Sequence, residues 1–224
     1  MTHQIDEKRR CLLSAGLCGV GLAFTNHWSL ADTNPQTPTP RQSKGPFYPI
    51  RLPLDKDNDL VRVAGQPRLA KGQVVDVVGR IVDERGRPVC NARVEIWQCD
   101  ANGRYRHPWD RQNAPMDPNF QGYGRYLTGS DGAYRFRTIK PIPYPGRAPH
   151  IHFAISGQNF TPLITQMYVA SASENAWDPL LNGISDTKAR QRLLVAFEDN
   201  ASGQDSDLIG HFEIVLAADG RYGR

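Results

Sequence analysis

The sequence lacks the features of a membrane protein, a nucleic-acid-binding protein or a repeat protein. Its longest apolar run, Cys11 to Phe24, has 14 residues, and a membrane-spanning helix needs roughly 20. The net charge is only +4, and no basic cluster with interleaved aromatic residues stands out, so we expect neither a membrane span nor a nucleic-acid partner. No internal period suggests repeats.

The first 31 residues have the composition of an export signal. Lys8, Arg9 and Arg10 precede the apolar run, and Ser29-Leu30-Ala31 provides the small residues that a signal peptidase reads. The arginine pair resembles a twin-arginine signal; an ordinary secretory signal is the alternative. We therefore expect residues 1–31 to be an export signal peptide and the protein to be exported, to the periplasm.

Without that signal, two of the four cysteines are left, Cys90 and Cys99. Residues 92–99 read as a strand, and a strand rises by about 3.3 Å per residue. The two sulfurs are then too far apart for a disulfide, which needs Cα atoms about 6 Å apart. Either both cysteines are free, or they pair elsewhere.

The rest of the chain reads as one domain of a mainly β fold. Residues 32–72 form an extended, Pro-rich arm, and residues 73–220 a β-sandwich with long active-site loops and one short helix. The helix is expected at 185–199 with Ser185 as its N-cap. Two long stretches rich in Arg, Pro and Gly, 100–129 and 140–149, are the loops. Strands are expected at 73–83, 92–99, 133–139, 150–156, 163–169 and 207–216.

The stretch "PHIHFAI" (149–155) places two of the six histidines on one strand. Side chains alternate along a strand, so His150 and His152 point to one side of the sheet and Ile151 and Phe153 to the other. Such a pair can chelate a metal, or it can reflect packing alone.

The long loops offer further ligands. Tyr105 lies in the first loop, and Tyr144 and Arg147 in the second. Imidazoles alone would suit zinc or copper, but phenolate is a hard anionic donor suited to ferric iron. Since a free phenol has a pKa of about 10, only a strong Lewis acid ionises it at neutral pH.

Three segments together resemble a known family: "GRIVDERGRPVCNARVEIWQCDANGRYRH", "GSDGAYRFRTIKPIPYPGRAPHIHFAISG" and "LITQMY". They are similar to the intradiol ring-cleavage dioxygenases, closest to protocatechuate 3,4-dioxygenase subunits, from about residue 45 to 216. The resemblance implies a ferric ion, Fe(3+), held by two tyrosines and two histidines, which fall on Tyr105, Tyr144, His150 and His152. Arg147 and Gln166 fall on the family's catalytic arginine and glutamine.

The resemblance also implies the reaction. A catechol-type substrate would be cleaved by O2 between its hydroxyl-bearing carbons to give a muconate-type diacid. Tyr144 would leave the metal and act as a base, whereas Tyr105 would stay bound. Arg147 would stabilise negative charge on the ring, and Gln166 would orient the substrate or the oxygen. The chain would act as a homo-oligomer or as one of two paired subunits.

The chain departs from the family pattern near Tyr144. Only "PGRAP" separates Tyr144 from His150, and Gly146 stands where protocatechuate enzymes have a tryptophan and an insertion. One wall of the pocket is therefore missing, which predicts tolerance for substituted catechols. Residues 32–72 also leave no room for the helical dimerisation region of catechol 1,2-dioxygenases.

Two other functions fit parts of the sequence. A non-enzymatic, transthyretin-like binding module would share the strands but not the tyrosine and histidine set, and a zinc hydrolase would use the histidines alone. Other polar candidates are expected to be solvated by default: His107, His211, Arg104, Arg106 and Arg125.

Overall fold

A computed structural model describes residues 35–201 and 206–222. The expected signal peptide, residues 1–31, lies outside these described residues. Within them, no helix is long and apolar enough to cross a membrane.

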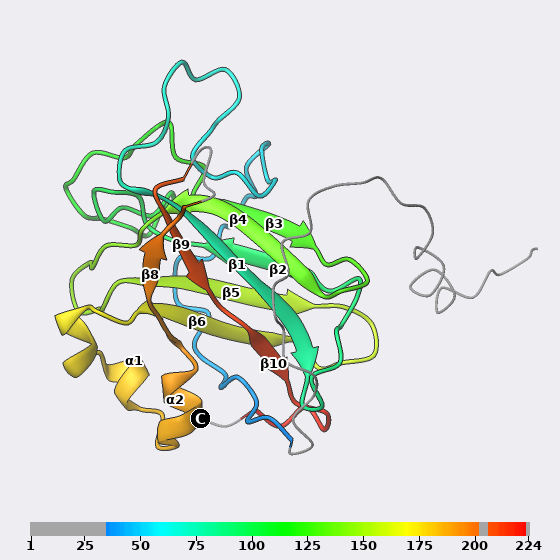
Figure 1. Ribbon diagram of the computed structural model, residues 1–224. Coiled ribbons are helices and arrows are strands. Elements are labelled where there is room, and N and C mark those ends of the chain that lie inside the picture. The colour runs from blue at the N-terminus through cyan, green and yellow to red at the C-terminus, as the bar shows by residue number, and fades with distance from the viewer. Residues whose placement is uncertain (1–34, 202–205, 223–224) are drawn as a thin grey trace, which may run out of the picture.

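In the described part of the chain, ten strands form two five-stranded sheets, whose arrangement Figure 1 shows. In the first sheet the order is β10-β1-β9-β8, with β4 antiparallel to β1; the second sheet has the order β3-β2-β5-β6-β7. The first sheet comprises β1 (Val74–Asp83), β4 (Ala133–Ile139), β8 (Phe197–Asp199), β9 (Leu208–His211) and β10 (Ile214–Leu216). The second comprises β2 (Arg93–Trp97), β3 (Tyr123–Leu127), β5 (His150–Ser156), β6 (Leu163–Val169) and β7 (Leu194–Val195).

The inner faces of the two sheets meet in one apolar core, as in a β-sandwich. Alternate residues of β4 and β5 point into it, because side chains alternate along a strand. The Phe153 ring of β5 lies 6.0 Å from that of Tyr134 in β4 and 5.0 Å from that of Phe212. The mainly β prediction is therefore confirmed, and the outer face of β5 is left for His150 and His152.

The predicted helix at 185–199 is wrong beyond its first turns. Helix α2 covers only Thr187–Gln191, and its N-cap is Asp186, not Ser185. Leu194 then pairs in parallel with Tyr168 of β6. Strand pairing at the edge of the second sheet therefore overrides the local helix propensity of these residues. Two further short helices precede it, η2 (Ser173–Ala176) and α1 (Pro179–Asn182).

Residues 35–45 of the Pro-rich arm form no helix or strand, and they cross both sheets. The backbone N–H of Thr39 donates to the Val215 carbonyl of β10 (3.0 Å), and that of Gln42 donates to the Ile164 carbonyl of β6 (2.8 Å). Thr39 is fully buried. The arm thereby delivers residues 43–48 to the outer face of the second sheet, beside the two histidines.

Candidate metal centre and active site

Strand register gathers the candidate residues on the outer face of the second sheet. Trp97 of β2, His152 of β5 and Gln166 of β6 are paired across neighbouring strands, and His150 pairs with Tyr168 of β6. Paired residues on one face lie about 5 Å apart. Two adjacent rows of the sheet therefore bring together a pair of imidazoles, an amide, a phenol and an indole.

The two imidazoles point at one another. Nε2 of His150 lies 3.2 Å from Nε2 of His152, and both residues are buried. A metal bound at about 2.1 Å to each nitrogen would hold the two nitrogens roughly 3 Å apart. The spacing therefore fits chelation of one cation by both rings.

Neighbouring groups fix each ring. Nδ1 of His150 lies 2.6 Å from the Ala148 carbonyl. A carbonyl can only accept a hydrogen bond, so Nδ1 carries the hydrogen and the lone pair of the neutral ring is on Nε2. The His152 ring is stacked on Trp97, with centroids 4.8 Å apart and planes at 7°. Burial, followed by the Arg147 charge, lowers the pKa of His150 to about 3. Burial, His150 and Arg147 also lower the pKa of His152 far below its usual value, so both rings are neutral at neutral pH.

Tyr105 adds a buried phenol to the pair. Its ring centroid is 6.2 Å from that of His152, and its hydroxyl is buried with no hydrogen-bond partner among the described residues. Burial, with smaller contributions from Cys99 and Tyr144, raises its pKa well above 10. A buried polar atom left without a partner costs free energy. A cation at this position would ionise the phenol and satisfy it.

Tyr144 supplies a second phenol on a tight turn. Its ring lies 5.4 Å from that of His150 and 5.6 Å from that of Tyr105. The Arg147 N–H donates to the Tyr144 carbonyl (3.0 Å), and Gly146 has φ +81°. Pro at the second and Gly at the third position of a four-residue turn favour this geometry. The turn leaves Tyr144 only half-buried.

Arg147 and Gln166 are joined in one hydrogen-bond network. Arg147 donates from Nη2 to Gln166 Oε1 (2.6 Å) and to the Tyr168 hydroxyl (3.0 Å), and from Nε to Asp178 Oδ2 (2.8 Å). Gln166 donates in turn to the Ser43 carbonyl (2.8 Å). The structure thus brings together all six residues that the sequence indicated: Tyr105, Tyr144, Arg147, His150, His152 and Gln166.

The N-terminal arm covers this site on one side. Gly45 has φ +68°, and a Cβ there would lie 3.3 Å from Cε1 of His152, so glycine is needed both for the backbone and for the close approach. Phe47 is stacked on Tyr105, with centroids 4.8 Å apart, and Tyr48 meets the Trp97 ring edge-on at 5.0 Å. Both aromatic residues anchor the arm.

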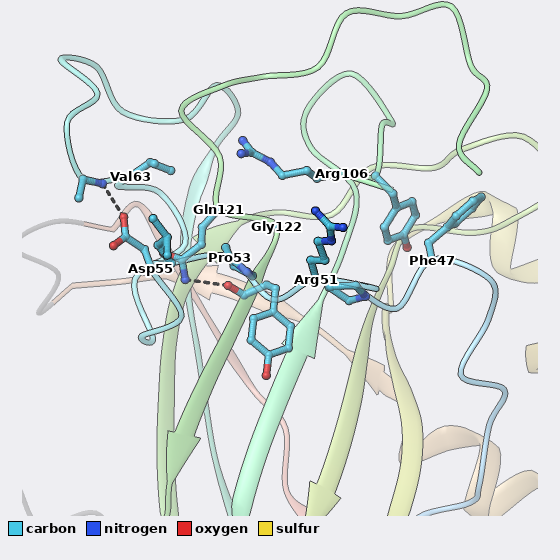
Figure 2. Close-up of a pocket in the computed structure, with 13 residues that line it drawn as sticks. Phe47, Arg51, Pro53, Asp55, Val63, Arg106, Gln121 and Gly122 are labelled. Atoms are coloured by element: carbon cyan, nitrogen blue, oxygen red, sulfur yellow. Dashed lines mark hydrogen bonds between the residues drawn. The ribbon is translucent and has the colours of Figure 1, made fainter. Parts of the chain in front are cut away.

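A cavity of about 330 Å³ is lined in part by Tyr105, and Figure 2 shows Phe47, Arg51 and Arg106 around it. Tyr105 and Phe47 lie between this cavity and the two histidines. The basic residues that line the cavity are Arg51 and Arg106. Arg106 is exposed, and its Nη2 donates to the carbonyls of Asp117, Pro118 and Phe120. The cavity is lined by Phe47, Pro49, Arg51, Pro53, Leu54, Asp55, Val63, Ala64, Tyr105, Arg106, Gln121, Gly122 and Tyr123.

Two residues expected to be solvated are structural instead. His107 is buried, and its Nδ1 accepts the Trp109 N–H (3.2 Å). Arg104 donates to the Ala114 carbonyl (2.7 Å) and lies 3.4 Å from the Asp110 carboxylate. Both hold the long first loop in shape. His211 and Arg125 are exposed, as expected.

Cys99 lies beneath the same site. It is a free, buried thiol, so the prediction that it does not pair with Cys90 is confirmed. Its Sγ donates weakly to the Ile142 carbonyl (3.8 Å). Burial raises its pKa to about 12 and leaves it a protonated packing residue.

Sequence reasoning missed Asp178 and underestimated Tyr168. Asp178 is fully buried and binds Arg147; Tyr168 was read as a packing aromatic, yet its hydroxyl contacts both Arg147 and Gln166. The available signals were Asp178-Pro179, a helix N-cap followed by proline, and the placement of Tyr168 two residues after Gln166 on a strand.

Comparison with known proteins identifies the family. The model of the Dioxygenase family matches residues 43–218. The protocatechuate 3,4-dioxygenase beta chain of Burkholderia cepacia is 39% identical over 195 residues, which cover 82% of this chain and 83% of that one. Hydroxyquinol 1,2-dioxygenase of Rhizobium sp. is 31% identical over 158 residues, but the chain spans only 50% of its length.

The dioxygenase domain of a dioxygenase and carbohydrate-binding fusion from Streptomyces sp. SirexAA-E matches with a TM-score of 0.61 and 27% identity, covering 80% of this chain and 98% of that one. The chain therefore belongs to the intradiol ring-cleavage dioxygenases, a family of oxidoreductases.

Proposed function

We propose that the chain binds Fe(3+) through Tyr105, Tyr144, His150 and His152 and cleaves a catechol-type substrate with O2 to a muconate-type diacid. The observation that carries the proposal is the convergence of His150 and His152, with Nε2 atoms 3.2 Å apart, beside two phenols. Two neutral imidazoles and two ionisable phenols are a donor set suited to a hard trivalent cation. The relatives are enzymes, and the transthyretin-like alternative gains no support from them.

The iron, when bound, would withdraw electron density from a dianionic catechol, so that a ring carbon reacts with O2. The catechol must first lose its two hydroxyl protons. Tyr144, as a phenolate, is suited to accept one of them, because it is half-buried on a turn, whereas Tyr105 is buried under Phe47; the other proton passes to solvent. We therefore assign the displaceable, proton-accepting role to Tyr144 and the permanent role to Tyr105.

Arg147 is suited to stabilise charge on the substrate. Burial lowers its pKa, but Tyr168, Asp178 and Tyr144 more than offset this and raise the pKa above its usual value, so it remains a cation. It also opposes the effect of burial on Tyr144, whose pKa is raised by burial and lowered by Arg147. The guanidinium thus favours negative charge at the position that Tyr144 vacates. Gln166, held between Arg147 and Ser43, is available to orient the substrate.

The open turn suggests the substrate range. A Cβ at Gly146 would meet no heavy atom of the described residues within 4 Å, so the space next to this position of the turn is open. Curated relatives include protocatechuate, hydroxyquinol and catechol dioxygenases. We propose that the chain accepts several substituted catechols.

A substrate screen tests the reaction and its range together. With catechol, protocatechuate, hydroxyquinol and a chlorinated catechol, we expect ring cleavage of at least two, with kcat/KM values within about 200-fold of one another, since a small substituent in an open pocket is discriminated by only ~1–3 kcal/mol. Mass spectrometry should find substrate plus O2 in each product. Activity on protocatechuate alone would contradict the open-pocket proposal, and cleavage of none would contradict the proposed function.

A further inference from the structure

The carboxylate of Asp178 makes more interactions than helix capping requires. Its Oδ1 accepts the backbone N–H groups of Leu180 and Leu181, both at 3.0 Å, and so caps α1. Its Oδ2 accepts Arg147 Nε and the Ala148 N–H, both at 2.8 Å. A carboxylate has about four acceptor positions, so all of them are used, two for the helix and two for the site.

Asp186 shows what a cap alone looks like in this fold. It caps α2 through Oδ1, which accepts the N–H groups of Lys188 (2.8 Å) and Ala189 (3.2 Å). Asp186 is exposed, whereas Asp178 is fully buried. Burying a carboxylate costs free energy unless it is paired and hydrogen-bonded. Capping a four-residue helix does not require a buried carboxylate, as Asp186 shows. We therefore attribute the burial of Asp178 to its ion pair with Arg147.

The ion pair determines where the guanidinium points. With Nε held by Asp178, the planar fork turns Nη2 toward Gln166 Oε1 (2.6 Å) and the Tyr168 hydroxyl (3.0 Å). An arginine has high rotamer entropy, and a bond at Nε removes much of it before a ligand arrives. Of the described groups that bind this guanidinium, Asp178 is the one that carries the opposite charge, whereas Gln166 and Tyr168 are neutral partners.

The same carboxylate reaches His150 through the backbone of one residue. Ala148 donates its N–H to Asp178 Oδ2 (2.8 Å), and its carbonyl lies 2.6 Å from Nδ1 of His150. The backbone conformation of Ala148 therefore links Asp178 to the ring that presents its Nε2 to His152. Outer partners of this kind set the tautomer and direction of an imidazole.

We infer that Asp178 is a positioning residue of the active site, which holds Arg147 in the orientation needed for ring cleavage and supports His150 through the backbone of Ala148. The inference rests on the proposed function, because Arg147 needs such support only if it acts on the substrate.

The test compares Asp178→Asn and Asp178→Ser with the cap control Asp186→Asn. Serine is a good N-cap, so Asp178→Ser keeps α1 capped but cannot reach Arg147. We expect both Asp178 variants to lower kcat about 10- to 100-fold, the usual effect of losing an outer partner, and Asp186→Asn to leave it unchanged. In an Arg147→Ala background, Asp178→Ser should reduce kcat by less than about twofold further, because the two residues act as one unit.

A second readout needs neither metal nor turnover. In 15N NMR of the metal-free protein, the Nε–H of Arg147 should exchange slowly with water in the wild type and in Asp186→Asn, and rapidly in Asp178→Ser. Equal loss of kcat in the Asp178 and Asp186 variants, or an Asp178→Ser effect that multiplies fully with Arg147→Ala, would overturn the inference. Unchanged exchange of the Arg147 Nε–H in Asp178→Ser would also overturn it. Should the wild type cleave no catechol, the proposed function fails, and the exchange measurement still decides whether Asp178 holds Arg147.

Discussion

Replacing His150 or His152 by alanine is expected to abolish iron binding. The two Nε2 atoms lie 3.2 Å apart and would share one cation, so removing either ring destroys the chelate and leaves the other imidazole buried beside two phenols. Loss of an outer partner alone lowers metal affinity about 10- to 100-fold, and loss of a direct ligand should exceed that. Metal analysis of the purified variants should find iron below a tenth of the wild-type content.

His211→Ala provides the matched control for this experiment. His211 lies at the end of β9 and is exposed, so its removal should leave the iron content unchanged. Thermal unfolding of each variant separates metal loss from misfolding, because Ile151 and Phe153 on the other face of β5 remain in the core. Full iron content in the His150→Ala, His152→Ala double variant would exclude this site.

Arg147→Ala is expected to retain iron but to lower kcat by about 10²- to 10³-fold, the usual effect of removing one donor that stabilises charge in the transition state. Arg147→Lys should restore little of the activity. The planar guanidinium binds Asp178 and Gln166 simultaneously, and a lysine ammonium cannot bridge the two in this way. Steady-state kinetics with a catechol and metal analysis measure both effects.

The control for Arg147 is Arg137→Ala. Arg137 has a similarly buried side chain and an ion pair with Asp59 at 3.2 Å, compared with 2.8 Å for Arg147 and Asp178, but it lies on β4 in the other sheet. Its loss should lower the melting temperature without changing kcat. Equal losses of kcat in the two variants would mean that Arg147 contributes to stability only.

Local sequence patterns predicted the strands on which the site lies, because side-chain alternation follows directly from strand geometry. The alternation in 150–156 and 163–169 predicted β5 and β6 at their observed bounds. It also predicted that His150 and His152 share a face, since a strand has a period of two. Spacing and residue type then indicated the two tyrosines, Arg147 and Gln166.

The errors arose where distant segments decide the outcome. Residues 185–199 have a helical pattern, but β6 offers a free edge to Leu194, and that pairing is not visible locally. Tyr123–Leu127 was assigned to a loop, yet it pairs with β2. Asp178 lies 31 residues from Arg147, and a single sequence contains no signal for such an ion pair.

The central claim is tested most directly by the visible spectrum of the purified protein, recorded before and after anaerobic addition of a catechol. Iron held by Tyr105 and Tyr144 should give a red-brown protein, through charge transfer from phenolate to ferric iron. Catechol should shift that band, because a catecholate arrives as the Tyr144 phenolate leaves. A colourless protein that cleaves catechols at the full rate, or a coloured one whose spectrum catechol leaves unchanged, would contradict the account.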